Sequence, residues 1–170
     1  LEEYLETKRM AFPRFYFLSN DELLEIMSQT RDPHAVQPHM SKCFDAIKRI
    51  KFGEGRQSHD ISGFMDPSGE FVPLSDSVKA EGPVEVWLLA FERAMRQTLY
   101  DRSKMAYENY PSSEEASIDR KDWLWSSPAQ VVIAIDQVLW TFNVTNALKQ
   151  MEGLDGMERN PLALENFLTF

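Results

Sequence analysis

Apolar residues recur every three or four positions along most of this chain, which is the spacing of helices with one buried face. The most regular stretch begins at Gly82 and Pro83 and predicts a helix that reaches about Tyr107. Its buried positions should be Val84, Leu88, Phe91, Met95 and Leu99. The same spacing predicts helices at residues 1–9, from about 20, over 33–50, over 127–148 and from 160 onward.

Capping residues mark where several of these helices begin. A capping box pairs a hydroxyl with a carboxylate or amide three residues later, and each side chain bonds the other's backbone N–H. Such pairs are Ser19 with Glu22, Ser112 with Glu115, and Ser127 with Gln130. Asp32 before Pro33 marks a further helix start. From its box we expect Ser127→Ala to cost about 1 kcal/mol of stability.

One β-hairpin, over residues 60–75, interrupts the helical pattern. Ile61–Met65 and Glu70–Leu74 flank Asp66–Gly69, whose proline and glycine suit the second and fourth positions of a type I turn. Pro73 cannot donate to a ladder, so its strand should lie at an edge of the sheet. The expected fold is therefore mainly α, a helical bundle or arm with a small inserted β-hairpin.

Two apolar segments depart from the simple pattern. Phe12–Phe17 is aromatic and contains Pro13, which predicts an extended segment. Val131–Ile135 could be a strand, but the length of the surrounding stretch and the cap before it favour a helix. Because that helix is apolar nearly all round, we expect it at the centre of the core. The run is far shorter than the roughly 20 residues that cross a bilayer, so we expect a soluble protein without a membrane partner.

Composition limits the function classes. Hydrophobic residues make up 43% of the 170-residue chain and aromatic residues 12%, which is enough for one sizeable core or two small ones. The net charge of −9 disfavours nucleic acid, membranes and acidic filaments as direct partners. Cys43 is the only cysteine, which excludes an internal disulfide and fits a reducing cytoplasmic compartment. No leader is visible, and both ends look cut, so we expect a piece of a longer polypeptide.

No residue set predicts a catalytic, cofactor or metal site. Gly53–Gly55 lacks the following Lys-Ser of a phosphate-binding loop, and we interpret it as a helix end that turns into a loop. His39 and Cys43 would face one side of a helix at metal-ligand spacing. However, Cys43 belongs to an apolar stripe, and His34 and His59 do not complete a four-ligand set. An enzyme built around His39 and Cys43 is therefore a weak hypothesis, since nothing supplies an orienting group.

The four tryptophans divide into two groups. Trp87 and Trp140 lie on helical stripes, so we expect them in the core. Trp123 and Trp125 lie in the sequence WLW outside such a stripe, and they are the better candidates for an interface.

Residues 12–45, FPRFYFLSNDELLEIMSQTRDPHAVQPHMSKCFD, resemble the linker region of axonemal dynein heavy chains. VEVWLLAFERAMRQTL resembles that family's long linker helix, SGEFVPL its hairpin strand, and DRKDWLWSSPAQVVIAIDQVLWT its WPxQVxxxxxQxxWT pattern. The resemblance runs over residues 1–148, with SSPAQ in place of WP(G/A)Q, and does not extend to GLDGMERNPLALENF. The family-motif and interface candidates are Phe12, Pro13, Arg14, Phe15, Tyr16, Phe17, Asn20, Asp21, Trp87, Trp123, Trp125, Gln130 and Trp140.

The resemblance implies that residues 1–170 are part of the linker domain of a much longer heavy chain. Dynein linkers are helical arms that lie across the ring of AAA+ modules and switch between bent and straight forms as the nucleotide changes, which moves the tail. The implied partners are the AAA+ ring of the same chain and, through the parent chain, other dynein subunits. The resemblance implies that ATP, Mg²⁺ and microtubules bind elsewhere in a parent ATPase, and that the location is the axoneme of a cilium or flagellum. The alternative from the residues alone is a stand-alone helical protein-interaction module.

Overall fold

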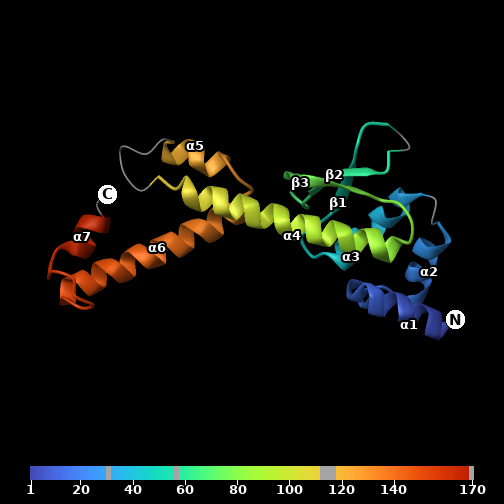
Figure 1. Ribbon diagram of the computed structural model, residues 1–170, viewed down its shortest axis with the longest axis horizontal. Coiled ribbons are helices and arrows are strands. Elements are labelled where there is room, and N and C mark those ends of the chain that lie inside the picture. Colours follow the sequence, from blue (N-terminus) through green and yellow to red (C-terminus); the bar gives the residue numbers. More distant parts are fainter. Residues whose placement is uncertain (30–31, 56–57, 112–117, 169–170) are drawn as a thin grey trace. The chain divides into compact units, whose positions relative to one another are not determined.

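The computed structural model describes residues 1–29, 32–55, 58–111 and 118–168 (Figure 1). Two compact units form, Leu1–Asp101 and Arg102–Phe170. As predicted, the fold is mainly α with a small antiparallel sheet. The first unit holds, in chain order, α1 (Glu2–Ala11), the 3₁₀ helix η1 (Pro13–Phe17), α2 (Asn20–Ser28), the 3₁₀ helix η2 (Pro33–His39), α3 (Met40–Cys43), β1 (Arg49–Phe52), β2 (Asp60–Met65), β3 (Phe71–Lys79) and most of α4 (Val84–Glu108).

The three strands form one sheet in the order β1-β2-β3. The predicted hairpin is confirmed as β2 and β3, although β3 continues to Lys79. The Asp66 carboxylate stabilises the turn by accepting a hydrogen bond from the Gly69 N–H (2.7 Å). Pro73 lies on an edge strand, where the ladder tolerates its missing N–H. Strand β1 was not predicted.

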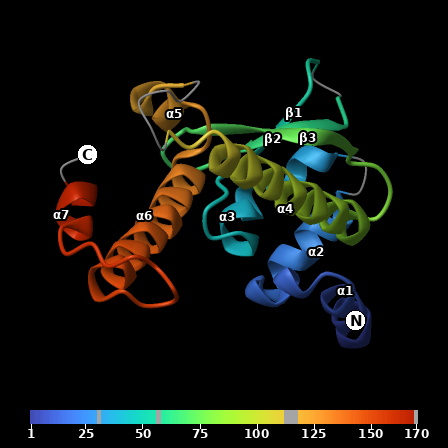
Figure 2. The same ribbon diagram turned by 60° about the vertical axis from the view of Figure 1, so that its left-hand side comes forward.

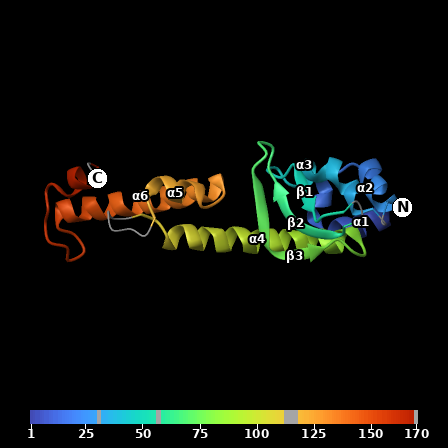
Figure 3. The same cartoon turned by 90° about the horizontal axis from the view of Figure 1, so that it is seen from above.

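The sheet and α4 run beside each other in Figures 2 and 3, and both contribute to the core of the first unit together with the segments from α1 to α3. The rings of Phe64 on β2 and Phe44 meet the ring of Phe91 edge to face, at centroid distances of 6.2 and 5.7 Å. The buried Thr98 hydroxyl accepts a hydrogen bond from the Ser75 N–H (2.9 Å), which fixes β3 to α4. Aromatic packing and this polar contact together place the sheet on the helix.

The prediction of α4 is confirmed at both ends. The helix begins after Gly82, whose φ of 79° turns the chain, and continues to Glu108. The predicted stripe is buried at Val84, Leu88 and Phe91, and Met95 and Leu99 pack against the core as partly buried residues.

Two of the predicted helix starts are also confirmed. The Ser19 hydroxyl accepts from the Glu22 N–H (3.3 Å), and the Glu22 carboxylate accepts from the Ser19 N–H (3.0 Å), which completes the capping box of α2. The Asp32 carboxylate accepts from the His34 N–H (2.9 Å) at the start of η2. Each of these two caps depends on a few adjacent residues, which is why the sequence pattern predicted them.

The predicted helix over residues 33–50 is wrong. The segment forms η2 and the short α3, leaves the helical conformation at Phe44 (ψ 114°) and becomes strand β1 at Arg49. Pro38 inside η2 has no N–H to donate, which disfavours a continuous α-helix. The apolar stripe nevertheless identified the core, because its members are buried whatever the backbone does. These are Val36, Met40, Cys43, Phe44, Ile47 and Ile50.

The prediction of an extended conformation for the aromatic segment is wrong, because the segment forms η1. Phe12 alone is extended (φ −135°, ψ 93°), and its carbonyl accepts from the Phe15 N–H (3.0 Å). Pro13 at the first helical position has the φ that a helix needs, so it starts this turn rather than preventing it.

The second unit contains α5 (Arg120–Trp125), α6 (Ala129–Glu152) and α7 (Ala163–Leu168) together with the end of α4. The Asp119 carboxylate caps α5 by accepting from the Asp122 N–H (2.8 Å). The predicted pair of Ser112 and Glu115 lies outside the described residues. The last helix was expected from residue 160, but α7 begins at Ala163, and the Asn160 side chain accepts from the Leu162 N–H (3.1 Å) in the turn before it.

The Ser127 capping box is wrong, and the stability prediction changes with it. Pro128 occupies the N-cap of α6, and no side chain caps this helix. Ser127→Ala is therefore expected to change the free energy of unfolding by less than about 0.5 kcal/mol. Asp119→Ala, which removes a cap that is present, should cost about 1 kcal/mol and serves as the matched control. Urea titrations monitored by circular dichroism give the free energy of unfolding of both variants. Equal losses in Ser127→Ala and Asp119→Ala would contradict the assignment of an uncapped α6 and a capped α5.

We expect protonation of the Glu22 carboxylate to lower the free energy of unfolding at acid pH. Its hydrogen bonds with Lys42 and with the Ser19 N–H lower its pKa from 4.5 to about 2. A depressed folded-state pKa gives stability that is present above 4.5 and is lost as the pH falls toward 2. The difference in free energy of unfolding between the native chain and Glu22→Gln should therefore be constant near neutrality and shrink below pH 4.5. Urea titrations across this range test it, and a difference independent of pH would refute it.

Candidate interaction surfaces

The aromatic segment η1 is divided between core and surface. Phe12 and Phe15 are fully buried, and their rings pack edge to face at 4.9 Å. Arg14 lies over the Phe44 ring (4.4 Å) and donates to the Cys43 carbonyl oxygen (3.0 Å), so it stabilises the fold.

The other candidates near η1 are exposed. Pro13, Tyr16 and Phe17 face solvent, and the Tyr16 hydroxyl donates to Glu6. Asn20 is exposed and accepts from Arg9 (2.8 Å), and Asp21 is exposed in the first turn of α2. Phe17, an exposed aromatic ring on this segment, remains the best interface candidate here.

The tryptophans do not follow the predicted division. Trp87 is buried, as expected. Trp123 is fully buried rather than at a surface, because its indole N–H donates to the Ala106 carbonyl oxygen (2.9 Å) and its ring meets Tyr110 edge to face. Trp140, expected in the core, is 53% exposed. Trp125 is 83% exposed, as an interface residue would be.

Helix α6 is not the buried central helix that its composition predicted. Only Val131, Val132 and Ala147 are buried among its 24 residues, all of which the structure describes. Gln130 is exposed in the first turn. We call its exposed apolar residues the α6 apolar surface: Ile133, Val138, Trp140, Phe142 and Leu148.

The α6 apolar surface occupies more than one side of the helix. Ile133 and Trp140 lie two turns apart on one side, whereas Val138 and Phe142 lie one turn apart on another. By length and composition alone, α6 could also cross a bilayer. Asp136 argues for a protein environment, because it forms an ion pair with Arg120 (2.8 Å) that a hydrocarbon core would disfavour. The arrangement fits a helix that packs between other helices.

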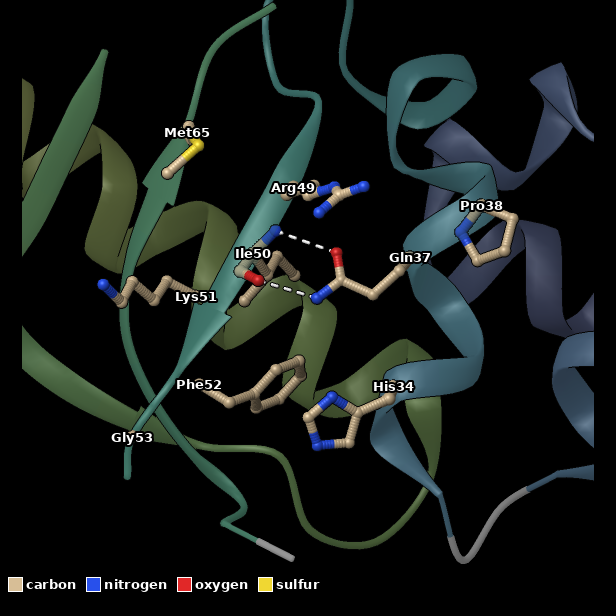
Figure 4. A pocket seen from close by; sticks show the side chains of 9 residues that line it. All are labelled: His34, Gln37, Pro38, Arg49, Ile50, Lys51, Phe52, Gly53 and Met65. Carbon is tan, nitrogen blue, oxygen red and sulfur yellow. Dashed lines mark hydrogen bonds between the residues drawn. The ribbon is translucent and has the colours of Figure 1, made fainter. Parts of the chain in front are cut away.

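A groove of about 640 Å³ separates η2 from the open edge of β1 (Figure 4). Gln37 reaches across it, and its amide donates to the Ile50 carbonyl oxygen (2.6 Å) and accepts from the Ile50 N–H (3.1 Å). This side chain thereby satisfies the two backbone groups of Ile50 with which a further strand would otherwise pair. The lining residues are His34, Gln37, Pro38, Arg49, Ile50, Lys51, Phe52, Gly53 and Met65.

Cys43 and His39, the two chemical candidates weighed from the sequence, both lie in the first unit and are buried. Burial raises the pKa of the Cys43 thiol to about 11, so the thiol stays protonated near neutrality. His39 ends η2 and lies 3.7 Å from Glu22 and 3.5 Å from Glu25. Among the described residues, no group of three or more His, Cys, Asp and Glu side chains could hold a metal ion. Gly53–Gly55 follows strand β1, so its interpretation as a helix end is wrong.

Comparison with known proteins gives one consistent result. The family described as "Dynein heavy chain, N-terminal region 2" matches residues 1–106. The chain is 50% identical over 149 residues to rat dynein axonemal heavy chain 1, with 88% of this chain covered. It is 42% identical over 166 residues to human dynein axonemal heavy chain 6, and 39% identical over 171 residues to human dynein axonemal heavy chain 12. The chain spans only 3–5% of the length of these relatives.

Proposed function

Because this chain belongs to the dynein heavy chain family, we propose that it is a mechanical linker segment of a microtubule motor. The segment couples the ATP-driven state of an AAA+ ring to movement of the tail of the same heavy chain. Its location is the axoneme of a cilium or flagellum, since the relatives it resembles are axonemal heavy chains. ATP and Mg²⁺ act in other regions of the parent polypeptide, as does microtubule binding.

The observation that carries this proposal is the α6 apolar surface. Exposed apolar residues on several sides of a helix are unfavourable in water, and burial against other elements stabilises such a helix. The relatives of this chain are far longer than the chain itself, so a parent polypeptide of that length can supply the covering elements. We infer that α6 packs against further helices of the same heavy chain.

Two long helices suit the transmission of force. At about 1.5 Å per residue, the 25 residues of α4 and the 24 of α6 each extend over roughly 36 Å. Close-packed side chains deform little and so pass strain from one element to the next. In the first unit, the Phe64–Phe91 packing and the Ser75–Thr98 hydrogen bond hold α4 to the sheet in this way.

The size of the native polypeptide tests this proposal. An antibody against this 19.7 kDa chain would be used on ciliary and cytosolic extracts of the source organism. We expect one very large band that is enriched in cilia. A small cytosolic band would contradict the linker assignment and favour the stand-alone interaction module.

A further inference from the structure

The sheet of the first unit has one buried face and one open face. Ile50, Phe64 and Val72 lie on the inner face and are buried against the core. On the opposite face, pairing places Arg49 beside Met65 and Met65 beside Phe71. Opposite residues of an antiparallel pair share a face, so these three side chains form one row. We call it the outer row.

The outer row lies between two hollows. One is the groove between η2 and β1, and the other, of about 360 Å³, lies beside the β2–β3 turn. Arg49 and Met65 line both hollows, so the two meet at these residues. Figure 4 shows Arg49 reaching toward η2 and Lys51 reaching toward β2. The result is a depression with an apolar floor at Met65 and cations beside it.

Gly63 keeps the floor of this depression flat. A Cβ atom at this position would lie 2.5 Å from both the Phe71 ring and the Val72 carbonyl oxygen. The Phe71 ring therefore covers the backbone of β2, and the Lys51 ammonium lies 5.0 Å from its centroid. Phe71 remains 39% exposed, so the ring can contact a partner.

The charge here is opposite to that of the whole chain. Lys48, Arg49 and Lys51 lie within one short segment of a chain whose net charge is −9. Within the described residues, neither Lys48 nor Arg49 forms an ion pair, whereas many other cations do. The Asp66 carboxylate lines the second hollow but is engaged by its own turn, because hydrogen bonds from the Ser68 hydroxyl and from the Gly69 and Glu70 N–H groups lower its pKa.

We propose that the outer row binds an acidic protein segment in which an apolar side chain is flanked by carboxylates. The apolar side chain packs on Met65 and Phe71, and the carboxylates pair with Lys48 and Arg49. Gln37 occupies the backbone groups of Ile50, so recognition uses side chains rather than addition of a strand. This proposal does not depend on the linker function.

A protein segment fits these observations better than nucleic acid. A nucleic-acid backbone is bound by many clustered cations, and the net negative charge of this chain repels its phosphates. Three cations beside an apolar floor match a short peptide with a few carboxylates and one apolar anchor. Charge complementarity therefore selects the chemistry of the partner.

Selection from a random twelve-residue peptide library on the purified 170-residue chain tests the proposal. We expect enrichment of sequences that place Asp and Glu around Leu, Met or Phe. Fluorescence anisotropy of labelled selected peptides should show an affinity loss of at least about tenfold in the double variant Lys48→Glu/Arg49→Glu. Lys121→Glu, which changes an exposed cation on α5, should have less than about a twofold effect.

The milder double variant Lys48→Gln/Arg49→Gln guards against misfolding, and circular dichroism checks that each variant is folded. It should still weaken binding, and Met65→Ser should do so without any change of charge. Failure to enrich acidic peptides would overturn the proposal. Acidic peptides that bind the two Lys48/Arg49 double variants and Met65→Ser as tightly as the native chain would also overturn it. So would a twelve-nucleotide DNA that binds the native chain more tightly than the selected peptides do.

Discussion

Trp123→Ala should lower the free energy of unfolding of the second unit by about 3–5 kcal/mol. Trp123 is fully buried, its indole N–H donates to the Ala106 carbonyl oxygen, and its ring packs on Tyr110. Truncation removes a side chain that is the largest fully buried one among the described residues, and it leaves both a cavity and a lost hydrogen bond. Since few other side chains among the described residues of this unit are buried, we expect much of its helical signal to disappear at low urea concentration.

The neighbouring Trp125 provides the matched control, because it is the same residue type on the same helix and is 83% exposed. Trp125→Ala should change the free energy of unfolding by less than about 0.5 kcal/mol. Trp123→Phe retains most of the packing and should lose less than the alanine variant. Urea titrations followed at 222 nm measure all three, and equal effects of Trp123→Ala and Trp125→Ala would contradict the assignment of α5.

The second large effect is expected at the ion pair between Lys8 on α1 and Glu85 on α4. The two side chains are only 18% and 9% exposed, and the hydrogen bond to Glu85 raises the pKa of Lys8. Lys8→Met would leave the Glu85 carboxylate buried without its cation, and we expect a loss of about 3 kcal/mol.

A double-mutant cycle separates the pair from its parts. Lys8→Met/Glu85→Met should recover most of the loss, because no buried charge remains. Lys104→Met breaks the exposed pair with Glu108 and should cost less than about 0.5 kcal/mol. Urea titrations give each value, and a double variant as unstable as Lys8→Met would argue that the loss comes from packing rather than charge.

Local signals in the sequence predicted local structure well. The Ser19 capping box, the Asp66–Gly69 turn and the start of α4 after Gly82 were all found, because each depends on a few adjacent residues. The helix over 33–50 was wrong because a short α-helix, a 3₁₀ helix and a strand can bury the same apolar positions. The alternation of charged and apolar residues in Arg49–Phe52 was the signal in the sequence that could have predicted β1.

The candidate surfaces were harder to predict, because exposure depends on which elements meet. Trp123 was expected at a surface but is buried against the end of α4. Trp140 was expected in the core but is exposed, because few residues of α6 are covered. Apolar character all round suggests a central helix, and the sequence does not say whether the covering elements belong to the same segment. The outer row was missed because β1 itself was missed.

The central claim is that this segment transmits force within a heavy chain, and microtubule gliding by the purified parent motor tests it most directly. Trp140→Asp charges the α6 apolar surface, and Gln137→Asp adds the same group at an exposed polar position of that helix. Neither should shift the unfolding midpoint of the 170-residue chain. In the parent motor, we expect Trp140→Asp to slow gliding severalfold while ATP hydrolysis continues, and Gln137→Asp to have little effect. Unchanged gliding in the Trp140→Asp motor would contradict the account.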